Sequence, residues 1–162
     1  MSKLYKAEYA SPLGVLEIVG TVEAIISILF SESNLEVEDS LNQTPKVVEE
    51  CMKQLDEYFN GTRLDFTFPY AYEGTDFQKT VWNALTSIPY GVTASYKSIA
   101  DHIGNTKAVR AVGSANGKNK LSIIIPCHRI IGSNGTLTGY AGELWRKEWL
   151  LEHEKLVRKS KS

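Results

Sequence analysis

Apolar and polar side chains alternate along the first third of the chain. Apolar residues recur at every second position, or in short unbroken runs, over residues 5–10, 15–20 and 24–30. A period of two predicts β-strands, and the Ser-Pro-Leu-Gly stretch after the first run predicts a tight turn. Residues 64–74 alternate in the same way and predict a further strand.

The spacing changes to that of a helix from Thr44 to Asn60. Apolar residues recur there every three or four positions, and Pro45 stands near the start, where a helix tolerates proline. Cys51 falls on this apolar stripe, which favours a role as core filling over a role in chemistry.

The pattern as a whole indicates two domains. A boundary is predicted at residues 72–76, where the alternation ends and helical spacing takes over. Residues 1–75 should form an α/β domain of structural role, and residues 76–162 a mostly helical domain. A chain of 162 residues is long enough to bury the cores that this division requires.

Residues 93–119 predict two short helices around a glycine turn. A hydroxyl at Thr93 or Ser95 can cap the first helix, and Thr106 can cap the second, which covers residues 107–116. Two short helices around a tight turn form the helix-turn-helix motif, so we expect that motif here.

The second of these helices is poor in side-chain bulk. Alanine, glycine and serine dominate it, and Lys107 and Arg110 give it positive charge. Small residues let a backbone approach another surface, and cations attract phosphates, so contact with DNA explains both features. Tight packing against a neighbouring helix, with the cations in solvent, explains them as well. Since the helix lacks long polar side chains for reading bases, any DNA binding should tolerate sequence changes.

Composition adds little until the chain is divided. The chain has 43% hydrophobic and 23% charged residues, typical of a globular protein, and no run of the ~20 apolar residues that span a membrane. Residues 1–76 carry 5 basic and 14 acidic side chains, whereas residues 77–162 carry 13 and 5. The second half therefore either meets an anion such as nucleic acid or attracts the first half. Without a signal peptide at the start, we expect a cytoplasmic protein.

The second cysteine stands in an unusual place. Ser122–Ile125 is an apolar stretch that predicts a buried strand or strand-like segment, and Pro126 ends it. Cys127 should therefore lie in a turn beside His128 and Arg129, whose basic side chains raise the reactive thiolate fraction. The residues alone leave open whether Cys127 is a nucleophile or a small apolar side chain. Two cysteines without CxxC or HxxxH spacing predict neither a disulfide framework nor a zinc site.

A cysteine nucleophile needs a base and a group that orients the base. His128 could serve as the base if the chain turns sharply or if a water bridges the two side chains, because adjacent residues of an extended chain point to opposite faces. Four glutamates of the last predicted helix compete to orient it, and spacing does not choose between them: Glu143, Glu148, Glu152 and Glu154. An apolar band is predicted on the same helix from Leu144, Trp145, Trp149, Leu150 and Leu151.

The stretch IPCHRII, followed by GYAGELWRKEWLLEHE, closely resembles the O6-alkylguanine-DNA alkyltransferases, the methylated-DNA–protein-cysteine methyltransferases. FQKTVWNAL, IPYGVTASYKSIA and KAVRAVGSANGKN match in order and spacing, so the resemblance covers residues 75–155 strongly. YASPLGVLEIVG extends it more weakly into the amino-terminal part. The resemblance implies a ribonuclease-H-like α/β domain before the helical one, and a single protein without a regulatory domain.

The resemblance also implies roles for individual residues. Cys127 matches the alkyl acceptor, and His128, acting through a water, forms with Glu154 the relay that generates the thiolate. Tyr96 is similar to the tyrosine that lies beside the flipped nucleotide and protonates the leaving guanine. Arg110 matches the arginine that enters the base stack after the nucleotide leaves it.

Two larger sets of residues follow from the same resemblance. The implied DNA contacts are Tyr96, Lys107, Arg110, Ala111, Ser114, Ala115 and Asn116. The implied base pocket consists of Ile130, Tyr140, Ala141 acting through its backbone N–H, and Asn119, which also ties the helix-turn-helix to the cysteine turn. The expected partner is double-stranded DNA containing O6-alkylguanine, bound by a monomer through the minor groove, with O4-alkylthymine as a further candidate substrate. No metal or cofactor is expected.

Three other functions remain as alternatives. A non-catalytic sensor of alkylated bases would bind damage without transferring the alkyl group, although such proteins lack the acceptor cysteine. A transcriptional regulator would need base-reading side chains on its recognition helix. A cysteine hydrolase would share the Cys, His and Glu constellation, turn over repeatedly and ignore DNA.

Overall fold

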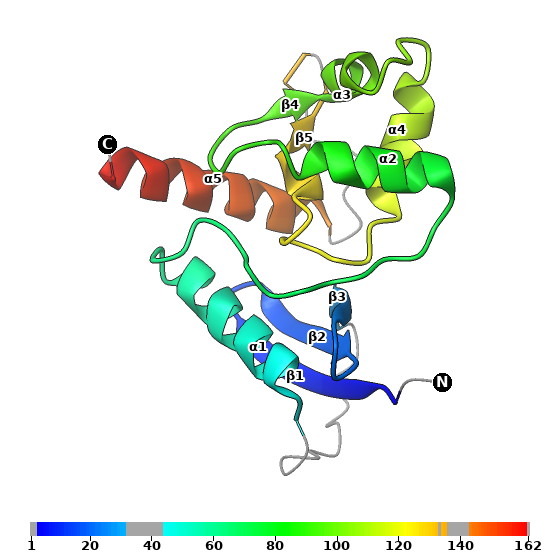
Figure 1. Cartoon of the computed structure of the whole chain (residues 1–162). Coiled ribbons are helices and arrows are strands. Elements are labelled where there is room, and N and C mark those ends of the chain that lie inside the picture. Colours follow the sequence, from blue (N-terminus) through cyan, green and yellow to red (C-terminus); the bar gives the residue numbers. More distant parts are fainter. Residues whose placement is uncertain (1–2, 32–43, 133, 136–142, 162) are drawn as a thin grey trace. The chain divides into compact units, whose positions relative to one another are not determined.

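The computed structural model describes residues 3–31, 44–132, 134–135 and 143–161. The chain divides into two compact units, the first ending at Tyr72 and the second beginning at Glu73. Unit 1 is a small antiparallel sheet with a helix, and unit 2 is mostly helical (Figure 1). The predicted order of an α/β part followed by a helical part is therefore confirmed.

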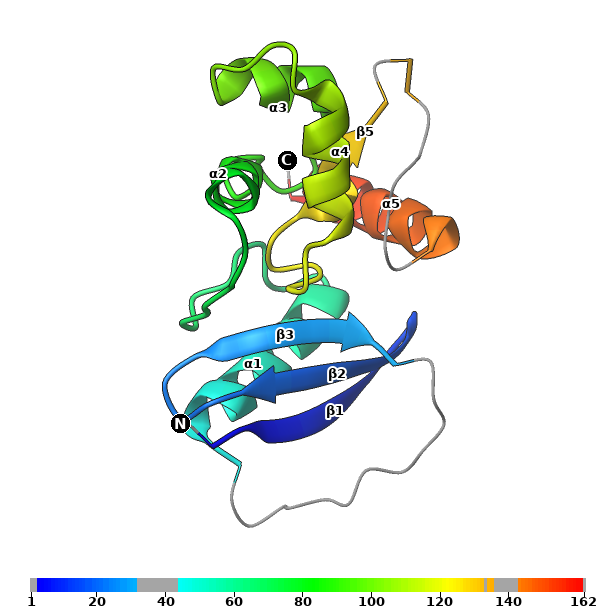
Figure 2. The same ribbon diagram turned by 90° about the vertical axis from the view of Figure 1, so that its right-hand side faces the viewer.

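The sheet of unit 1 consists of β1 (Tyr5–Ser11), β2 (Gly14–Gly20) and β3 (Ile25–Phe30), in that order and antiparallel (Figure 2). Alternation along β2 buries Leu16 and Ile18 completely. The turn between β1 and β2 is closed where the Ser11 hydroxyl donates to the Gly14 carbonyl oxygen at 2.6 Å. All three strand predictions for the first thirty residues are confirmed.

The helix α1 (Lys46–Phe59) packs its apolar stripe against one face of this sheet (Figure 2). Pro45 precedes its first residue and Asn60 follows its last, as the sequence predicts. Cys51 on the stripe is completely buried. Burial raises the pKa of its thiol to about 12, so Cys51 fills the core and is not a nucleophile at neutral pH.

The strand predicted over residues 64–74 is wrong. The structure has a single bridge there, between Tyr70 and Ile25. Pro69 has no N–H to donate to a strand ladder, and the N–H of Thr67 donates instead to the Gln54 side chain at 2.9 Å. The apolar side chains of this segment reflect packing, since Phe68 is buried.

Unit 2 begins with α2 (Asp76–Leu85) and continues with α3 (Tyr96–His102) and α4 (Val109–Gly117). Ser95 caps α3 by accepting the backbone N–H of Ser98 at 2.9 Å, which confirms one of the two predicted caps.

The start of α4 differs from the prediction. Ala108 stands at its amino terminus without any side-chain cap, so the cap predicted at Thr106 is wrong. The turn before α4 contains Gly104, whose φ of 78° favours glycine. The indole N–H of Trp82 in α2 donates to the Ala115 carbonyl oxygen of α4 at 2.8 Å, which fixes the two helices against each other.

The apolar stretch Ser122–Ile125 is buried but is not a strand. Ile123 has a φ of 74°, and the N–H of Ile125 donates to the Leu121 carbonyl oxygen, so the chain turns back on itself. The two-residue strands of unit 2 lie elsewhere: β4 (Ala94–Ser95) pairs in parallel with β5 (Ile130–Ile131).

The apolar band predicted on the last helix is confirmed at Leu150 but not at Leu144 and Trp145. This helix, α5 (Leu144–Ser160), buries Lys147, Leu150 and Glu154, whereas Leu144 and Trp145 are about half exposed. The buried positions are separated by three and four residues and therefore share one face. Two of the three are charged, so the inward face of α5 is not recognisable from hydrophobicity.

Candidate active site

The predicted cysteine turn is present as a short 3-10 helix, η2 (Cys127–Arg129), directly before β5. The N–H of Arg129 donates to the Pro126 carbonyl oxygen at 3.0 Å and closes the turn. Cys127, His128 and Arg129 are all buried. A turn of this kind lets three consecutive side chains point inward, which an extended chain does not allow.

Two asparagines hold the cysteine from the side of α4. The Asn119 amide donates to the Cys127 Sγ at 3.2 Å and to the Ile125 carbonyl oxygen at 3.0 Å. The Asn116 amide donates to the Cys127 carbonyl oxygen at 3.3 Å. The helix that carries the predicted DNA face is therefore joined to the cysteine turn by hydrogen bonds.

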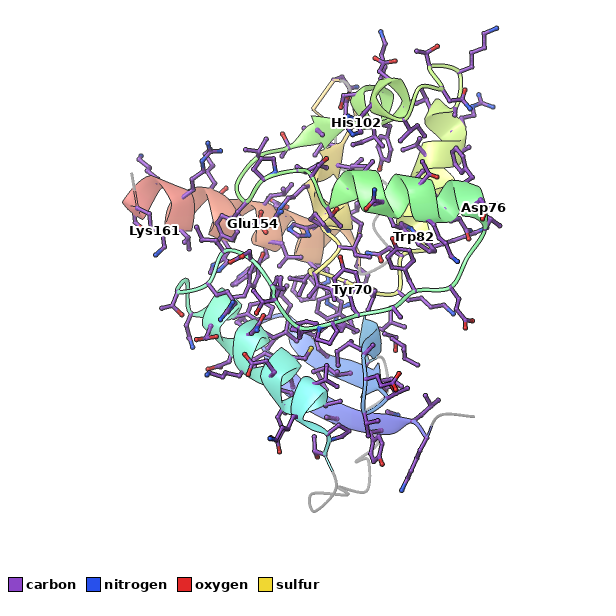
Figure 3. The ribbon with its side chains drawn as sticks, viewed as in Figure 1. Tyr70, Asp76, Trp82, His102, Glu154 and Lys161 are labelled. Carbon is purple, nitrogen blue, oxygen red and sulfur yellow. The ribbon has the colours of Figure 1, made fainter. Side chains whose placement is uncertain are left out.

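Glu154 of α5, which is labelled in Figure 3, completes the site beside His128. Its carboxylate lies 2.6 Å from His128 Nε2 and accepts two hydrogen bonds from the Arg129 guanidinium, at 2.8 Å and 3.1 Å. The backbone N–H of Gly91 donates to it at 3.2 Å. Of the four glutamates that the sequence left open, the structure brings Glu154 to the histidine.

The turn at residues 88–91, for which the sequence predicted no role, forms part of the site. Arg129 Nη1 donates to the Ile88 carbonyl oxygen at 2.8 Å, and the guanidinium lies over the Tyr90 ring. Gly91 adopts a φ of 76°, and a side chain there would collide with Arg158. The glycine was visible in the sequence, but its contact with Glu154 was not.

The charges around Glu154 determine the protonation state and the tautomer of His128. Burial alone would raise the pKa of Glu154, but His128 and Arg129 hold it well below its usual range, so Glu154 is ionised. Burial lowers the pKa of His128 and keeps its ring neutral, despite the opposing charge of Glu154. A neutral ring beside a carboxylate donates through Nε2, which leaves Nδ1 as an acceptor. Nδ1 is buried and has no hydrogen-bond partner among the described residues.

The thiol of Cys127 is protonated in this environment. Burial raises its pKa, which outweighs the Asn119 hydrogen bond, the nearby positive charge of Lys147 and backbone hydrogen bonds that lower it. The sequence predicted that basic neighbours would favour a thiolate. The structure shows that burial dominates, so the proton must be removed during the reaction.

The exposed side of α4 carries part of the predicted DNA-binding set. Arg110, Ala111 and Ser114 are exposed on one side of α4, and Lys107 is exposed in the turn just before the helix. Tyr96 begins α3 and lies against α4, since a side-chain carbon added at Gly113 would stand 3.6 Å from the Tyr96 ring.

Other predicted residues lie elsewhere. The DNA contact of Ala115 and Asn116 stays a prediction, and the structure buries both residues on the inner side of α4. The reason is the helical period, which turns them toward α2 and the cysteine turn. Ile130 is buried in β5, next to the turn. Tyr140 and Ala141 lie outside the described residues.

Within the described ranges, no three histidine, cysteine or acidic side chains gather where they could hold a metal ion. The same part of the chain contains no helix long and apolar enough to cross a membrane.

Comparison with known proteins connects this arrangement to a family. Residues 76–156 match the family model described as 6-O-methylguanine DNA methyltransferase, DNA binding domain, and residues 4–72 match the ribonuclease-like domain of the same family. The chain belongs to the 6-O-methylguanine DNA methyltransferase family.

Relatives in this methyltransferase family match along almost their whole length. The methylated-DNA–protein-cysteine methyltransferase of Methanosarcina acetivorans is 46% identical over 93% of this chain and 98% of its own. The constitutive methylated-DNA–protein-cysteine methyltransferase of Bacillus subtilis is 41% identical over 97% of this chain and 99% of its own.

Solved structures show the same methyltransferase fold. The O6-methylguanine methyltransferase of Mycobacterium tuberculosis superposes with a TM-score of 0.84 at 42% identity, covering 95% of this chain and 94% of that one. A crystal structure from the same organism in complex with DNA gives a TM-score of 0.83 at 43% identity, covering 93% and 92%.

Proposed function

We propose that this protein repairs O6-alkylguanine in double-stranded DNA by transferring the alkyl group irreversibly to Cys127. The observation that carries the proposal is a buried cluster in which Asn119 donates to the Cys127 thiol and the adjacent His128 is paired with Glu154. Such a cluster activates a thiol without a metal or cofactor. Family membership and a relative solved in complex with DNA support the choice of substrate.

The proton path follows from the histidine tautomer. His128 Nδ1 is the unoccupied acceptor of the ring, so it takes the Cys127 proton, and we infer that a bound water carries it between them. Glu154 and its bonds to Arg129 and Gly91 keep Nε2 as the donor and stabilise the imidazolium that forms. The thiolate then attacks the alkyl carbon, and the C–O bond to guanine breaks.

The exposed side of α4 supplies the DNA contact in this proposal. With α3 it forms a helix-turn-helix whose small residues, Ala111 and Ser114, suit close approach to the narrow minor groove. The alkylated nucleotide is extruded at a cost of a few kcal/mol, and Arg110 occupies the space that it leaves. Tyr96, at the start of α3 and against Gly113 of α4, donates a proton to the leaving guanine. Tyr140, Ala141 and Ile130 complete the base pocket.

The test is the intact mass of the protein after incubation with a duplex that contains one O6-methylguanine. We expect a gain of one methyl group per molecule that saturates, and no gain for Cys127→Ser. A Cys51→Ser variant is the matched control and should gain the methyl group like the unaltered chain, because Cys51 lies in the core of unit 1.

The other outcomes identify the alternatives. Tight binding of the damaged duplex without a mass gain would make the protein a damage sensor. If the protein neither binds the damaged duplex nor gains mass, but hydrolyses a thioester or amide substrate repeatedly, it is a hydrolase. A second duplex with O4-methylthymine tests whether the pocket also accepts that base.

A further inference from the structure

Asn116 is a buried asparagine near the end of α4, on the side of this helix that faces the cysteine turn. Its side chain is 1% exposed, and its amide nitrogen donates to the Cys127 carbonyl oxygen at 3.3 Å. That carbonyl belongs to the peptide group that joins Cys127 to His128. The amide of Asn116 therefore lies against the backbone between the cysteine and the histidine.

The hydrogen bond to Cys127 determines which way the amide of Asn116 points. A carboxamide has an NH2 group and an oxygen on the same carbon, and only the NH2 group can donate to a carbonyl. The oxygen, Oδ1, is therefore the amide atom that is turned away from the Cys127 carbonyl. Oδ1 is buried and has no hydrogen-bond partner among the residues that the structure describes.

His128 offers a second acceptor of the same kind at this turn. Its Nδ1 is also buried, and nothing in the described part of the chain donates to it. Burying an acceptor without a donor costs free energy, so ordered water commonly binds such atoms in folded proteins. Two acceptors need two donors, and a single water molecule supplies both.

We propose that Asn116 is a positioning residue for the reaction, and that its Oδ1 and His128 Nδ1 together hold the water that takes the Cys127 proton. The inference deepens the proposed function and rests on it, because it concerns the proton relay of the same site. Asn116 acts through the water, whereas His128 remains the base.

The orientation of the water follows from its two donated hydrogen bonds. A water whose hydrogens point to Asn116 and His128 can meet the thiol only through the lone pairs of its oxygen, so it accepts the S–H of Cys127. When the thiol proton passes to the water oxygen, the hydrogen that faces His128 passes to Nδ1. The water is restored, and a thiolate and an imidazolium are formed.

Asn119 has a different task at the same thiol. Its amide donates to Cys127 Sγ at 3.2 Å, so it stabilises the negative charge that forms on sulfur. Asn119 thus directs a donor to the sulfur, and Asn116 directs an acceptor to the water. A change at Asn116 should therefore slow removal of the proton without altering the reactivity of the thiolate once it has formed.

The first experiment measures the rate at which iodoacetamide alkylates Cys127 between pH 6 and 10, followed by mass on the Cys127 peptide. Asn116→Leu should slow the reaction about tenfold at pH 7, because a well-placed general base contributes at least about a hundredfold. The difference should shrink steadily toward pH 10, where hydroxide removes the thiol proton without the relay. Asn83→Leu, at an exposed position of α2, is the matched control and should leave the profile unchanged.

The charged and titratable groups around Cys127 are the same in all these proteins. His128 and Arg129 lie in the turn, and Lys147 and Glu154 lie on α5. Since Asn116→Leu alters none of them, a change in the pH profile reports the water and its anchor.

The second experiment repeats the measurement at pH 7 in a His128→Phe background, which keeps a ring but has no acceptor. If Asn116 acts through the relay water, Asn116→Leu should slow this protein by less than about twofold more, because the relay no longer operates. Circular dichroism establishes that each variant is folded. If His128→Phe does not fold, the pH profile of Asn116→Leu decides alone, and Asn116→Ala replaces Asn116→Leu if that variant does not fold.

Two kinds of result would overturn the assignment. Equal rates for Asn116→Leu and the unaltered chain at pH 7 would mean that Oδ1 holds no water that the relay needs. Slowing by one constant factor, at every pH or in both backgrounds, would mean that Asn116 only holds the backbone of the turn. Iodoacetamide needs no DNA, so these comparisons decide the role of Asn116 even if the unaltered chain takes up no methyl group and the proposed function fails.

Discussion

The two units of this protein bury different kinds of side chain. The core of unit 1 consists of aliphatic and aromatic residues, and its buried polar side chain, Gln54, is satisfied by Glu50 and Thr67. Among its described residues, unit 2 buries five side chains at the site and on α5 that carry or can carry a charge: Cys127, His128, Arg129, Lys147 and Glu154.

The difference indicates what each core is for. Burying an apolar side chain stabilises a fold by about 1.5–3 kcal/mol, whereas a buried ion pair often contributes nothing compared with apolar residues of the same volume. The charges of unit 2 are therefore not explained by stability. In the proposed function, these side chains serve to deprotonate Cys127 and to hold the resulting charges.

The largest expected effect comes from removing the central anion of unit 2. Replacing Glu154 by Gln leaves Arg129 buried without its carboxylate, which should lower the free energy of unfolding by about 3–5 kcal/mol. Urea denaturation followed by tryptophan fluorescence measures this in unit 2, because Trp82, Trp145 and Trp149 all belong to it. Glu152→Gln, at an exposed position of the same helix, should change little. If Glu154→Gln lowers the free energy of unfolding no more than Glu152→Gln does, the Glu154 network does not stabilise unit 2.

A destabilising change in unit 1 should lower the stability of that unit without slowing alkyl transfer. Leu55→Ala removes a completely buried side chain of α1 and should cost about 2–5 kcal/mol by leaving a cavity. Labelling of the Cys51 thiol during urea denaturation reports unit 1, with the partly exposed Leu29→Ala as control. The rate of alkyl transfer per folded molecule should stay constant, since the reacting groups belong to unit 2. A slower transfer would show that the apolar core contributes to the chemistry.

The pH dependence of stability should also differ between the units. Burial holds the pKa of His128 below its ordinary value, so the unfolded chain binds this proton more readily. Unit 2 should therefore lose about 1–2 kcal/mol as the pH falls from about 7 to 5.

Unit 1 contains none of the three histidines and should stay nearly unchanged over that range. Tryptophan fluorescence reports the unfolding of unit 2, and Cys51 labelling reports that of unit 1. Measuring both in parallel gives the pH dependence of each unit. Equal slopes would show that His128 does not determine the acid sensitivity of unit 2.

The smallest expected effect concerns the DNA-binding side of α4. Arg110→Ala should weaken binding of duplex DNA by about tenfold. It should also reduce the slope of log Kd against log salt concentration by about one. Lys53→Ala, an exposed cation of unit 1, is the control and should leave both unchanged. Fluorescence anisotropy at several salt concentrations gives both quantities. A loss equal in the two variants would mean that overall charge, rather than α4, drives binding.

Local patterns predicted most of the elements correctly. The three strands, α1, the Ser95 cap and the turn at Cys127 depend on residues close in sequence, whose propensities and turn chemistry act locally. Ser122–Ile125 and residues 64–74 were misassigned, because an apolar pattern reports packing rather than strand pairing. Ser122–Ile125 is buried without pairing, and residues 64–74 bury Phe68 and form a single bridge. At Ile123 the backbone adopts a positive φ, which no apolar pattern predicts.

The sequence by itself determined that Cys127 lies in a turn beside a histidine, since proline and the neighbouring residues set that conformation. Only the tertiary structure decided which glutamate meets His128, that Gly91 and Ile88 complete the network, and that Lys147 faces inward. The period of a helix fixes which residues share a face, but packing against another element decides which face is buried. On α5 the buried face carries Lys147 and Glu154 beside Leu150, so hydrophobicity alone did not identify it.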